Sequence, residues 1–160
     1  MSQTKLANPM DLLRFQLRTA LTMEHDSLAA LEELSGAAQG KEVVRLLRHH
    51  MDETKEQIEN LNRGFELLDL TPSTAGSPAT KGITRQAQSL LARIDAPALH
   101  DLAVLSSAMG NEHFEISMYE ALVAQTRTDH AEVSALLRTN LDQEVHTSQE
   151  LKTQLLDRTS

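Results

Sequence analysis

Apolar side chains recur every three to four residues through most of this chain, which is the spacing of one face of an α-helix. Four long segments show the pattern, at roughly residues 9–35, 41–70, 97–127 and 129–157. The first begins at Asn8-Pro9, where asparagine suits the N-cap and proline suits the first helical position. Asp129 with Glu132 three residues later is typical of a capping box at the start of the last helix. The pattern therefore predicts four long amphipathic helices.

Residues 71–80 interrupt this pattern. They read TPSTAGSPAT, a linker rich in proline, glycine, serine and threonine that is incompatible with a helix interior. A short amphipathic helix is expected to follow at about 83–94. Short turns near residues 36–40 and Thr128 join the long helices into two hairpins. We predict one all-α domain over residues 1–160, a four-helix bundle with a short extra helix between helices two and three. The pattern leaves open whether helices two and three run parallel.

Composition narrows the class of protein. Hydrophobic residues make up 40% of the chain but aromatic residues only 2%, which favours helices over strands. The net charge of −8 and the pI near 5.3 argue against nucleic acid or an anionic membrane as the partner. Because the chain has no cysteine, thiolate metal sites and cysteine catalysis are excluded. The chain shows neither a secretory apolar region nor a bilayer-spanning run, so a soluble cytoplasmic protein is expected.

Acidic side chains interrupt the apolar faces of all four long helices. In the segment LSSAMGNEHFEISMYEALV (residues 105–123), Glu112 lies at the centre of the apolar stripe and Glu115 lies inside it one turn on. The full set is Glu24, Glu112 and Glu144 at stripe centres, Glu115 within its stripe, Glu53 at a stripe border, and His50, the only histidine that faces them. Burial of an ionised carboxylate without a partner costs several kcal/mol, so these positions require an explanation.

The acidic residues also fall at similar heights in the predicted bundle. Glu24 precedes the first hairpin turn by about fourteen residues, and His50 and Glu53 follow it by about twelve to fifteen. Glu112 and Glu144 are each about sixteen residues from the second turn. With a rise of about 1.5 Å per residue, antiparallel neighbours with such offsets come level. We therefore expect all four helices to contribute to one acidic layer.

The inward faces of these helices carry no lysine or arginine. Ionised carboxylates roughly 4 to 6 Å apart repel one another by several kcal/mol in a low-dielectric interior. Two explanations remain open: most of the layer is protonated, with raised pKa values, or multivalent cations lie among the carboxylates. Carboxylates with one imidazole suit iron or manganese, with zinc as a third candidate. The Glu-x-x-His motif of dinuclear bundles is absent, and the nearest pattern is the reversed His50-x-x-Glu53.

Two segments carry a resemblance to a known family. HMDETKEQIENL (residues 50–61) and NEHFEISMYEAL (residues 111–122) resemble the helix-two and helix-three signatures of the YciF-like family of small bacterial ferritin-like stress proteins. The resemblance extends from about Asp11 to Leu155 and implies a ferritin-like bundle with a crossing connection, a centre of two iron or manganese ions per chain, and a homodimer. The ligands that it implies are Glu24, His50, Glu53, Glu112, Glu115 and Glu144. Lys55 and Ser148 stand where some members have histidine and aspartate, which weakens the case for the second ion.

The first functional hypothesis is a ferritin-like stress protein whose dinuclear centre reacts with oxygen or peroxide or sequesters the metal. Tyr119, one turn past Glu115, is interpreted first as a buried phenol bonded to a carboxylate and second as a redox residue. The alternative function is a metal-poor bundle that acts as a stress-associated structural or interaction protein. Its contacts would lie on the outer side of helix one and the short helix, around Phe15, Ile83 and Leu90. An iron-storing cage is a weaker third interpretation.

Overall fold

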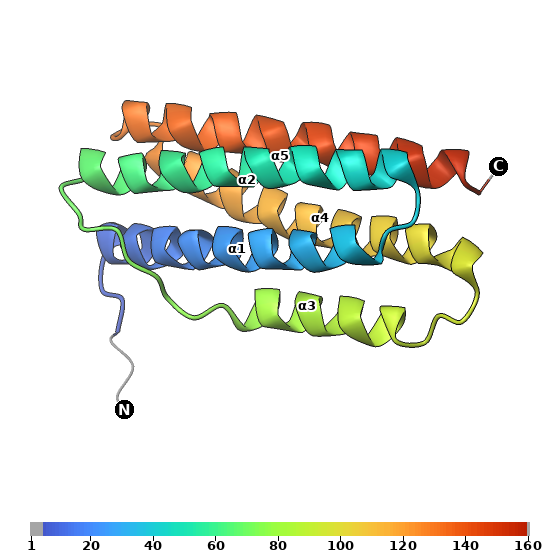
Figure 1. The fold of residues 1–160 in the computed structure, drawn as a ribbon. Helices are drawn as coiled ribbons and strands as arrows, with labels where there is room; N and C mark the ends of the chain where they lie inside the picture. The colour runs from blue at the N-terminus through green and yellow to red at the C-terminus, as the bar shows by residue number, and fades with distance from the viewer. Residues whose placement is uncertain (1–4, 160) are drawn as a thin grey trace.

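The computed structural model describes residues 5–159, a range that is mostly α-helix and contains no strand (Figure 1). The helices are α1 (Pro9–Ala37), α2 (Lys41–Leu67), α3 (Pro78–Leu91), η1, a single turn of 3₁₀ helix (Pro97–Leu99), α4 (His100–Thr126) and α5 (Ala131–Asp157). The predicted all-α class is confirmed. The predicted domain, residues 1–160, also includes residues 1–4 and 160, which lie outside the described range. Within residues 5–159, no helix combines the length and the apolar character needed to cross a membrane.

The four long helices form the bundle, and α3 lies on its outside. α1 packs against α2 and α4, and α5 packs against the same two helices, so α1 and α5 occupy opposite corners. α2 and α4 run in the same direction because residues 68–99, which include α3, return along the length of the bundle (Figure 1). This is the crossing connection that the resemblance implied and the apolar pattern left open. On its way α3 covers parts of α4 and α1.

The short helix begins earlier than expected. The prediction that residues 71–80 form only a linker is wrong for the last three, because α3 begins at Pro78 rather than near Ile83. Ser77 caps the helix, since its hydroxyl accepts a hydrogen bond from the Thr80 backbone N–H at 3.4 Å. The Ser-Pro pair is thus a helix start inside a segment whose composition is typical of a loop.

Side chains from other helices hold α3 against the middle of α1 and fix the turn that follows α1. Thr80 Oγ1 donates to one carboxylate oxygen of Asp26 at 2.6 Å, and Lys81 Nζ donates to the other at 2.8 Å, which holds α3 against α1. The turn between α1 and α2 is held by Asp101 of α4, which accepts hydrogen bonds from the backbone N–H groups of Gln39 at 2.8 Å and Gly40 at 3.0 Å. These contacts position α1 relative to the second half of the chain.

One predicted helix cap is present and one is not. Asn8 Oδ1 accepts a hydrogen bond from the Asp11 backbone N–H at 2.9 Å, as the sequence predicted for the start of α1. The predicted Asp129–Glu132 capping box is wrong, because α5 starts one residue later, directly after His130, and no side chain caps it. The residue before α5 is instead bonded to the end of α4, since the His130 backbone N–H donates a hydrogen bond to the Thr126 carbonyl at 2.9 Å.

The buried acidic residues divide the apolar core into two clusters. The first cluster comprises Leu13, Leu17, Ala20, Leu21, Met23, Leu61, Phe65, Tyr119, Leu122, Val133 and Leu137. The second comprises Leu31, Leu34, Val43, Leu47, Val104, Leu105, Ala108 and Leu151. On every long helix the acidic positions fall between the residues of the two clusters. The acidic layer expected from the sequence therefore lies at mid-bundle, closed off by apolar packing on both sides.

Candidate metal centre

Four side chains with metal-ligand chemistry converge between the two apolar clusters. They are His50 of α2, Glu112 and Glu115 of α4, and Glu144 of α5, and one ligand atom from each lies within 4.8 Å of all the others. His50 Nε2 is 2.9 Å from Glu112 Oε1 and 4.0 Å from Glu144 Oε2. All four side chains are buried. We refer to these four residues as the central cluster.

Glu24 approaches the central cluster from α1 and is held by Tyr119. The Tyr119 hydroxyl donates a short hydrogen bond to Glu24 Oε1, and both side chains are fully buried. Asn140 Nδ2 donates to the same hydroxyl oxygen at 3.0 Å, which directs the phenolic proton toward Glu24. The first interpretation of Tyr119, a buried phenol bonded to a carboxylate, is confirmed.

Six buried carboxylate oxygens in this layer have no hydrogen-bond partner within the described part of the chain. They are Glu24 Oε2, Glu112 Oε2, and both oxygens of Glu115 and of Glu144. Buried polar atoms are normally hydrogen-bonded, since each unsatisfied one costs about 1–3 kcal/mol. Six such acceptors around one imidazole form a site that suits a cation.

The pKa values of the buried glutamates are shifted upward. Burial raises the pKa of Glu24 to about 8, and the Tyr119 hydrogen bond and the His50 charge oppose this shift only in part. Burial also raises the pKa values of Glu115 and Glu144 well above their ordinary range, and repulsion from neighbouring carboxylates acts in the same direction. Glu24 therefore holds a proton at neutral pH when no cation is present, and Glu115 and Glu144 favour their protonated forms more strongly than an ordinary glutamate does.

His50, in contrast to the glutamates, favours its charged form. Burial lowers the pKa of its imidazole, but the charge of Glu112 and contacts with Glu112 and Glu53 outweigh burial and raise the pKa well above the ordinary value. Protons thus stabilise the metal-free layer, as the first of the two open explanations required. A cation that binds must displace these protons, so its affinity should increase with pH.

Glu53 lies at the edge of the layer rather than in the central cluster. Its side chain is 13% exposed, and Oε2 is 3.5 Å from His50 Nδ1 and accepts a hydrogen bond from Thr147 Oγ1 at 3.0 Å. Burial opposes ionisation, but the hydrogen bonds and the charge of His50 outweigh it and lower the pKa of Glu53. Of the six residues predicted as ligands, the structure thus brings four together and leaves Glu24 and Glu53 beside them.

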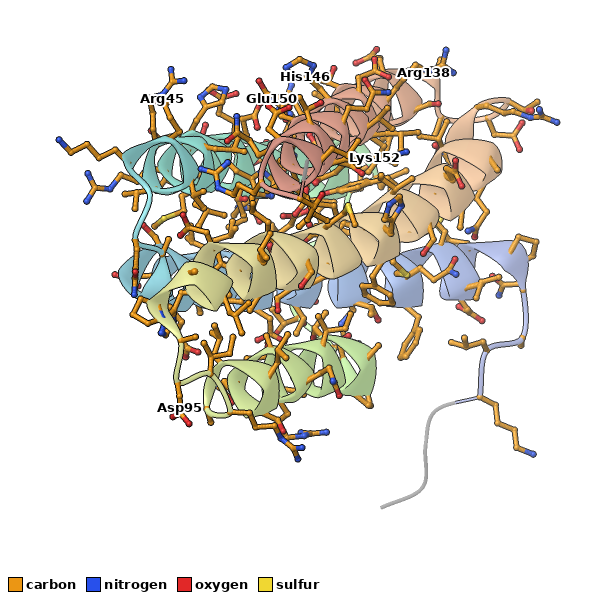
Figure 2. All side chains as sticks on the ribbon, turned by 90° about the vertical axis from the view of Figure 1, so that its right-hand side faces the viewer. Arg45, Asp95, Arg138, His146, Glu150 and Lys152 are labelled. Carbon is orange, nitrogen blue, oxygen red and sulfur yellow. The ribbon has the colours of Figure 1, made fainter. Side chains whose placement is uncertain are left out.

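The side chains predicted to point away from the layer are exposed. This group comprises Arg14, His25, Lys55, Arg63, His113, Arg138, His146 and Lys152. Figure 2 shows Arg138 and His146 on the outer side of α5. Lys55 pairs with Asp52 at 2.8 Å on the surface of α2. Among residues 5–159, no lysine or arginine is buried, as expected for the inner layer.

Sequence reasoning missed two polar residues that organise the site. Asn140 is fully buried one turn before Glu144, and it donates to the Tyr119 hydroxyl and, at 3.2 Å, to the Gln57 carbonyl. Thr147 is buried three residues after Glu144 and donates to Glu53. Both lie on the same face of α5 as Glu144, at helical spacing, and this spacing was the available signal. Their hydrogen-bond partners belong to other helices and were not predictable.

A mid-bundle layer of carboxylates with one imidazole, in a bundle with a crossing connection, defines a ferritin-like four-helix protein. The chain belongs to the family described as Domain of unknown function (DUF892), whose model matches residues 8–159. It is 23% identical to protein YciF of Escherichia coli strain K12 over 130 residues, which are 80% of this chain and 78% of YciF. The resemblance to YciF-like stress proteins is confirmed.

Solved structures share the whole fold. YcfI of Rhodopseudomonas palustris matches with a TM-score of 0.92 at 28% identity, over 96% of this chain and 98% of YcfI. The Escherichia coli stress protein YciF matches with a TM-score of 0.91 at 21% identity, over 96% of this chain and 98% of YciF. A protein from Xanthomonas campestris pv. campestris matches with a TM-score of 0.74 at 22% identity, over 94% of this chain and 92% of that protein. The predicted bundle with its extra helix is therefore a fold found in solved relatives.

Proposed function

We propose that this chain binds two Fe(II) or Mn(II) ions in its acidic layer and that it reacts with oxygen or peroxide, or sequesters the metal, during stress. The observation that carries this proposal is the set of six buried, unpartnered carboxylate oxygens beside one imidazole. Each unsatisfied acceptor destabilises the metal-free fold, so a layer of apolar side chains would give a more stable metal-free protein than these carboxylates do. A bound cation compensates for that cost.

The donor atoms fit the proposed ions. Carboxylate oxygens with one imidazole nitrogen, and no sulfur ligand, suit iron and manganese, and they also admit zinc. The central cluster would hold an ion through His50 and the three carboxylates. Glu24 flanks this cluster and would complete a second position, for which carboxylates of the central cluster can serve as shared ligands.

When bound, iron would supply electrons to oxygen or peroxide. The chain's own contribution is to exclude bulk water, since all four residues of the central cluster are buried. Tyr119 holds Glu24 in place through the phenolic hydrogen bond. Ionisation of Glu24, Glu115 and Glu144 would release the protons that stabilise the metal-free layer. An activity of this kind agrees with the description of the Escherichia coli relative as a stress protein.

Anaerobic titration with Fe(II), followed by elemental analysis after gel filtration, tests this proposal. We expect about two irons per chain, and admission of air should then produce ferric absorption in the near-ultraviolet. Glu112→Gln should bind less than half as much iron, while the matched control Glu120→Gln, on the exposed side of the same helix, should bind as the wild type does. If the wild-type protein binds neither iron, manganese nor zinc, the proposal is refuted.

A second candidate function is a structural or interaction protein, as expected from exposed apolar residues. Phe15 is 44% exposed and Leu90 is 37% exposed, whereas Ile83 is half-buried. The Rhodopseudomonas palustris relative is described as a candidate structural protein. A homodimer formed through this side would suit that role. The two functions differ in their response to a chelator, since a metal that binds only the folded state raises the melting temperature and its removal lowers it. A melting temperature indifferent to chelator would favour the structural role.

A further inference from the structure

A buried metal site requires a path along which the ion can reach it. Of the six residues that the resemblance implies as ligands, five are at most 1% exposed, and the only one with appreciable exposure is Glu53, at 13%. Glu53 projects from α2 toward α5, where Thr147 donates a hydrogen bond to it. The path from solvent should therefore lead between α2 and α5.

Three consecutive contacts connect the surface to the central cluster at this point. The His49 side chain is 63% exposed, and its Nε2 atom is 3.6 Å from Glu53 Oε1. Glu53 Oε2 is 3.5 Å from His50 Nδ1, and His50 is 1% exposed. His50 Nε2 in turn contacts Glu112 at 2.9 Å. The two oxygens of one carboxylate thus face in different directions, one toward a surface imidazole and one toward a buried imidazole.

A groove of about 330 Å³ lies over the outer end of this series, between α2 and α5. It is lined by His49 and His146 and by the carboxylates of Glu42 and Glu150. The groove also contains Arg45, which is neutralised by Glu42 at 2.7 Å. Figure 2 shows Arg45, His146 and Glu150 along the same outer edge of the α2–α5 pair. Imidazoles and carboxylates at the mouth can attract a divalent cation and exchange its water ligands.

We propose that the gap between α2 and α5 is the uptake route for the divalent cation, with His49 as the first contact and Glu53 as the side chain that passes the ion to His50. This inference rests on the proposed function, because it assumes that an ion reaches the central cluster. It assigns Glu53 a role in transfer rather than permanent binding. Thr147 holds the carboxylate across the gap, with one oxygen toward His49 and the other toward His50.

A transfer residue and a ligand have different kinetic signatures. A residue that only lowers the barrier to passage changes the association and dissociation rate constants by the same factor and leaves the dissociation constant unchanged. A ligand stabilises the bound state, so its loss increases the dissociation constant and acts mainly on the dissociation rate. His49 and Glu53 should follow the first pattern, and Glu112 should follow the second.

Stopped-flow absorption with Co(II), an ion that is stable in air, separates these patterns when combined with equilibrium dialysis of the same samples. We expect association to be slowed about threefold in His49→Ala and about tenfold in Glu53→Gln, with dissociation constants within about twofold of the wild type. The matched control is His113→Ala, which removes an exposed histidine from α4 and should bind at the wild-type rate. His49 is on the surface, so its variant tests the route even if Glu53→Gln folds poorly.

Four outcomes would overturn this proposal. If His49→Ala and Glu53→Gln bind Co(II) at the wild-type rate, or if His113→Ala is slowed equally, passage does not occur between α2 and α5. If Glu53→Gln increases the dissociation constant about tenfold without slowing association, Glu53 is a ligand and not a transfer residue. Absence of Co(II) binding by the wild type would refute the proposed function together with the route, whereas normal binding with unchanged rates would refute the route alone.

Discussion

Raising the pH from 5 to 7 is expected to destabilise the metal-free protein. The buried carboxyl of Glu24 has a pKa of about 8 in the folded chain, against 4.5 for an ordinary glutamate. Above pH 4.5 the unfolded chain loses this proton while the folded chain keeps it. The folded state therefore binds more protons, and its free energy of unfolding falls as the pH rises toward 8.

The size of the effect follows from the two pKa values. For Glu24 alone, the loss between pH 5 and pH 7 is about 2 to 3 kcal/mol. Glu115 and Glu144 act in the same direction, because their pKa values are also raised. His50, whose pKa is raised above its ordinary value of 6.5, contributes stability that is complete below pH 6.5 and is lost as the pH rises through its folded value. Asp101 has a lowered pKa and contributes stability that is lost only in acid, below its ordinary value of 3.8, so it does not mask the effect.

Urea unfolding of metal-stripped protein, followed by circular dichroism at pH 5, 6, 7 and 8, measures this dependence. Glu24→Gln should reduce the loss between pH 5 and 7 by about 2 to 3 kcal/mol, since the amide keeps an acceptor for Tyr119 and does not titrate. The exposed Glu120→Gln variant should behave as the wild type does. Addition of Mn(II) should restore stability, and by more at pH 8 than at pH 6, because the metal competes with protons. If the free energy of unfolding of the metal-free protein stays constant or increases from pH 5 to pH 7, this explanation is refuted.

Further predictions concern single side chains. Tyr119→Phe removes the donor to Glu24 and leaves Asn140 without its acceptor, so we expect a loss of about 1–3 kcal/mol in urea unfolding; a loss below about 0.5 kcal/mol would contradict the hydrogen-bond chain. Phe65→Ala opens a cavity in the first apolar cluster and should cost about 3–5 kcal/mol, without changing metal stoichiometry. Asp101→Ala frees the α1–α2 turn and should cost about 1 kcal/mol in urea unfolding at pH 7. The cost should be smaller at pH 3, because the pKa of Asp101 is lowered in the folded chain and the unfolded chain takes up this proton below its ordinary value of 3.8; an equal cost at both pH values would contradict a role for the ionised carboxylate.

Several features of the site followed from local rules. The helical spacing placed Glu112 and Glu115 on an apolar face, and the distances to the hairpin turns placed Glu24, His50 and Glu144 level with them. These conclusions held because antiparallel helices joined by short turns have little freedom in their relative height. Local rules gave wrong predictions for the start of two helices, the Asp129–Glu132 capping box and the start of α3 after Ser77. The position of a helix start depends on where the neighbouring helix allows the chain to turn.

The sequence by itself determined that the chain forms four long amphipathic helices and that acidic residues fall at the centre of their apolar faces. Periodicity is a local property, and each helix expresses it before it meets its partners. Only the tertiary structure decided that α2 and α4 run parallel, that Tyr119 and Asn140 hold Glu24, and that Glu53 remains at the edge between solvent and His50. Those outcomes depend on which helices become neighbours and how closely they approach, and a residue's position along its own helix does not fix either.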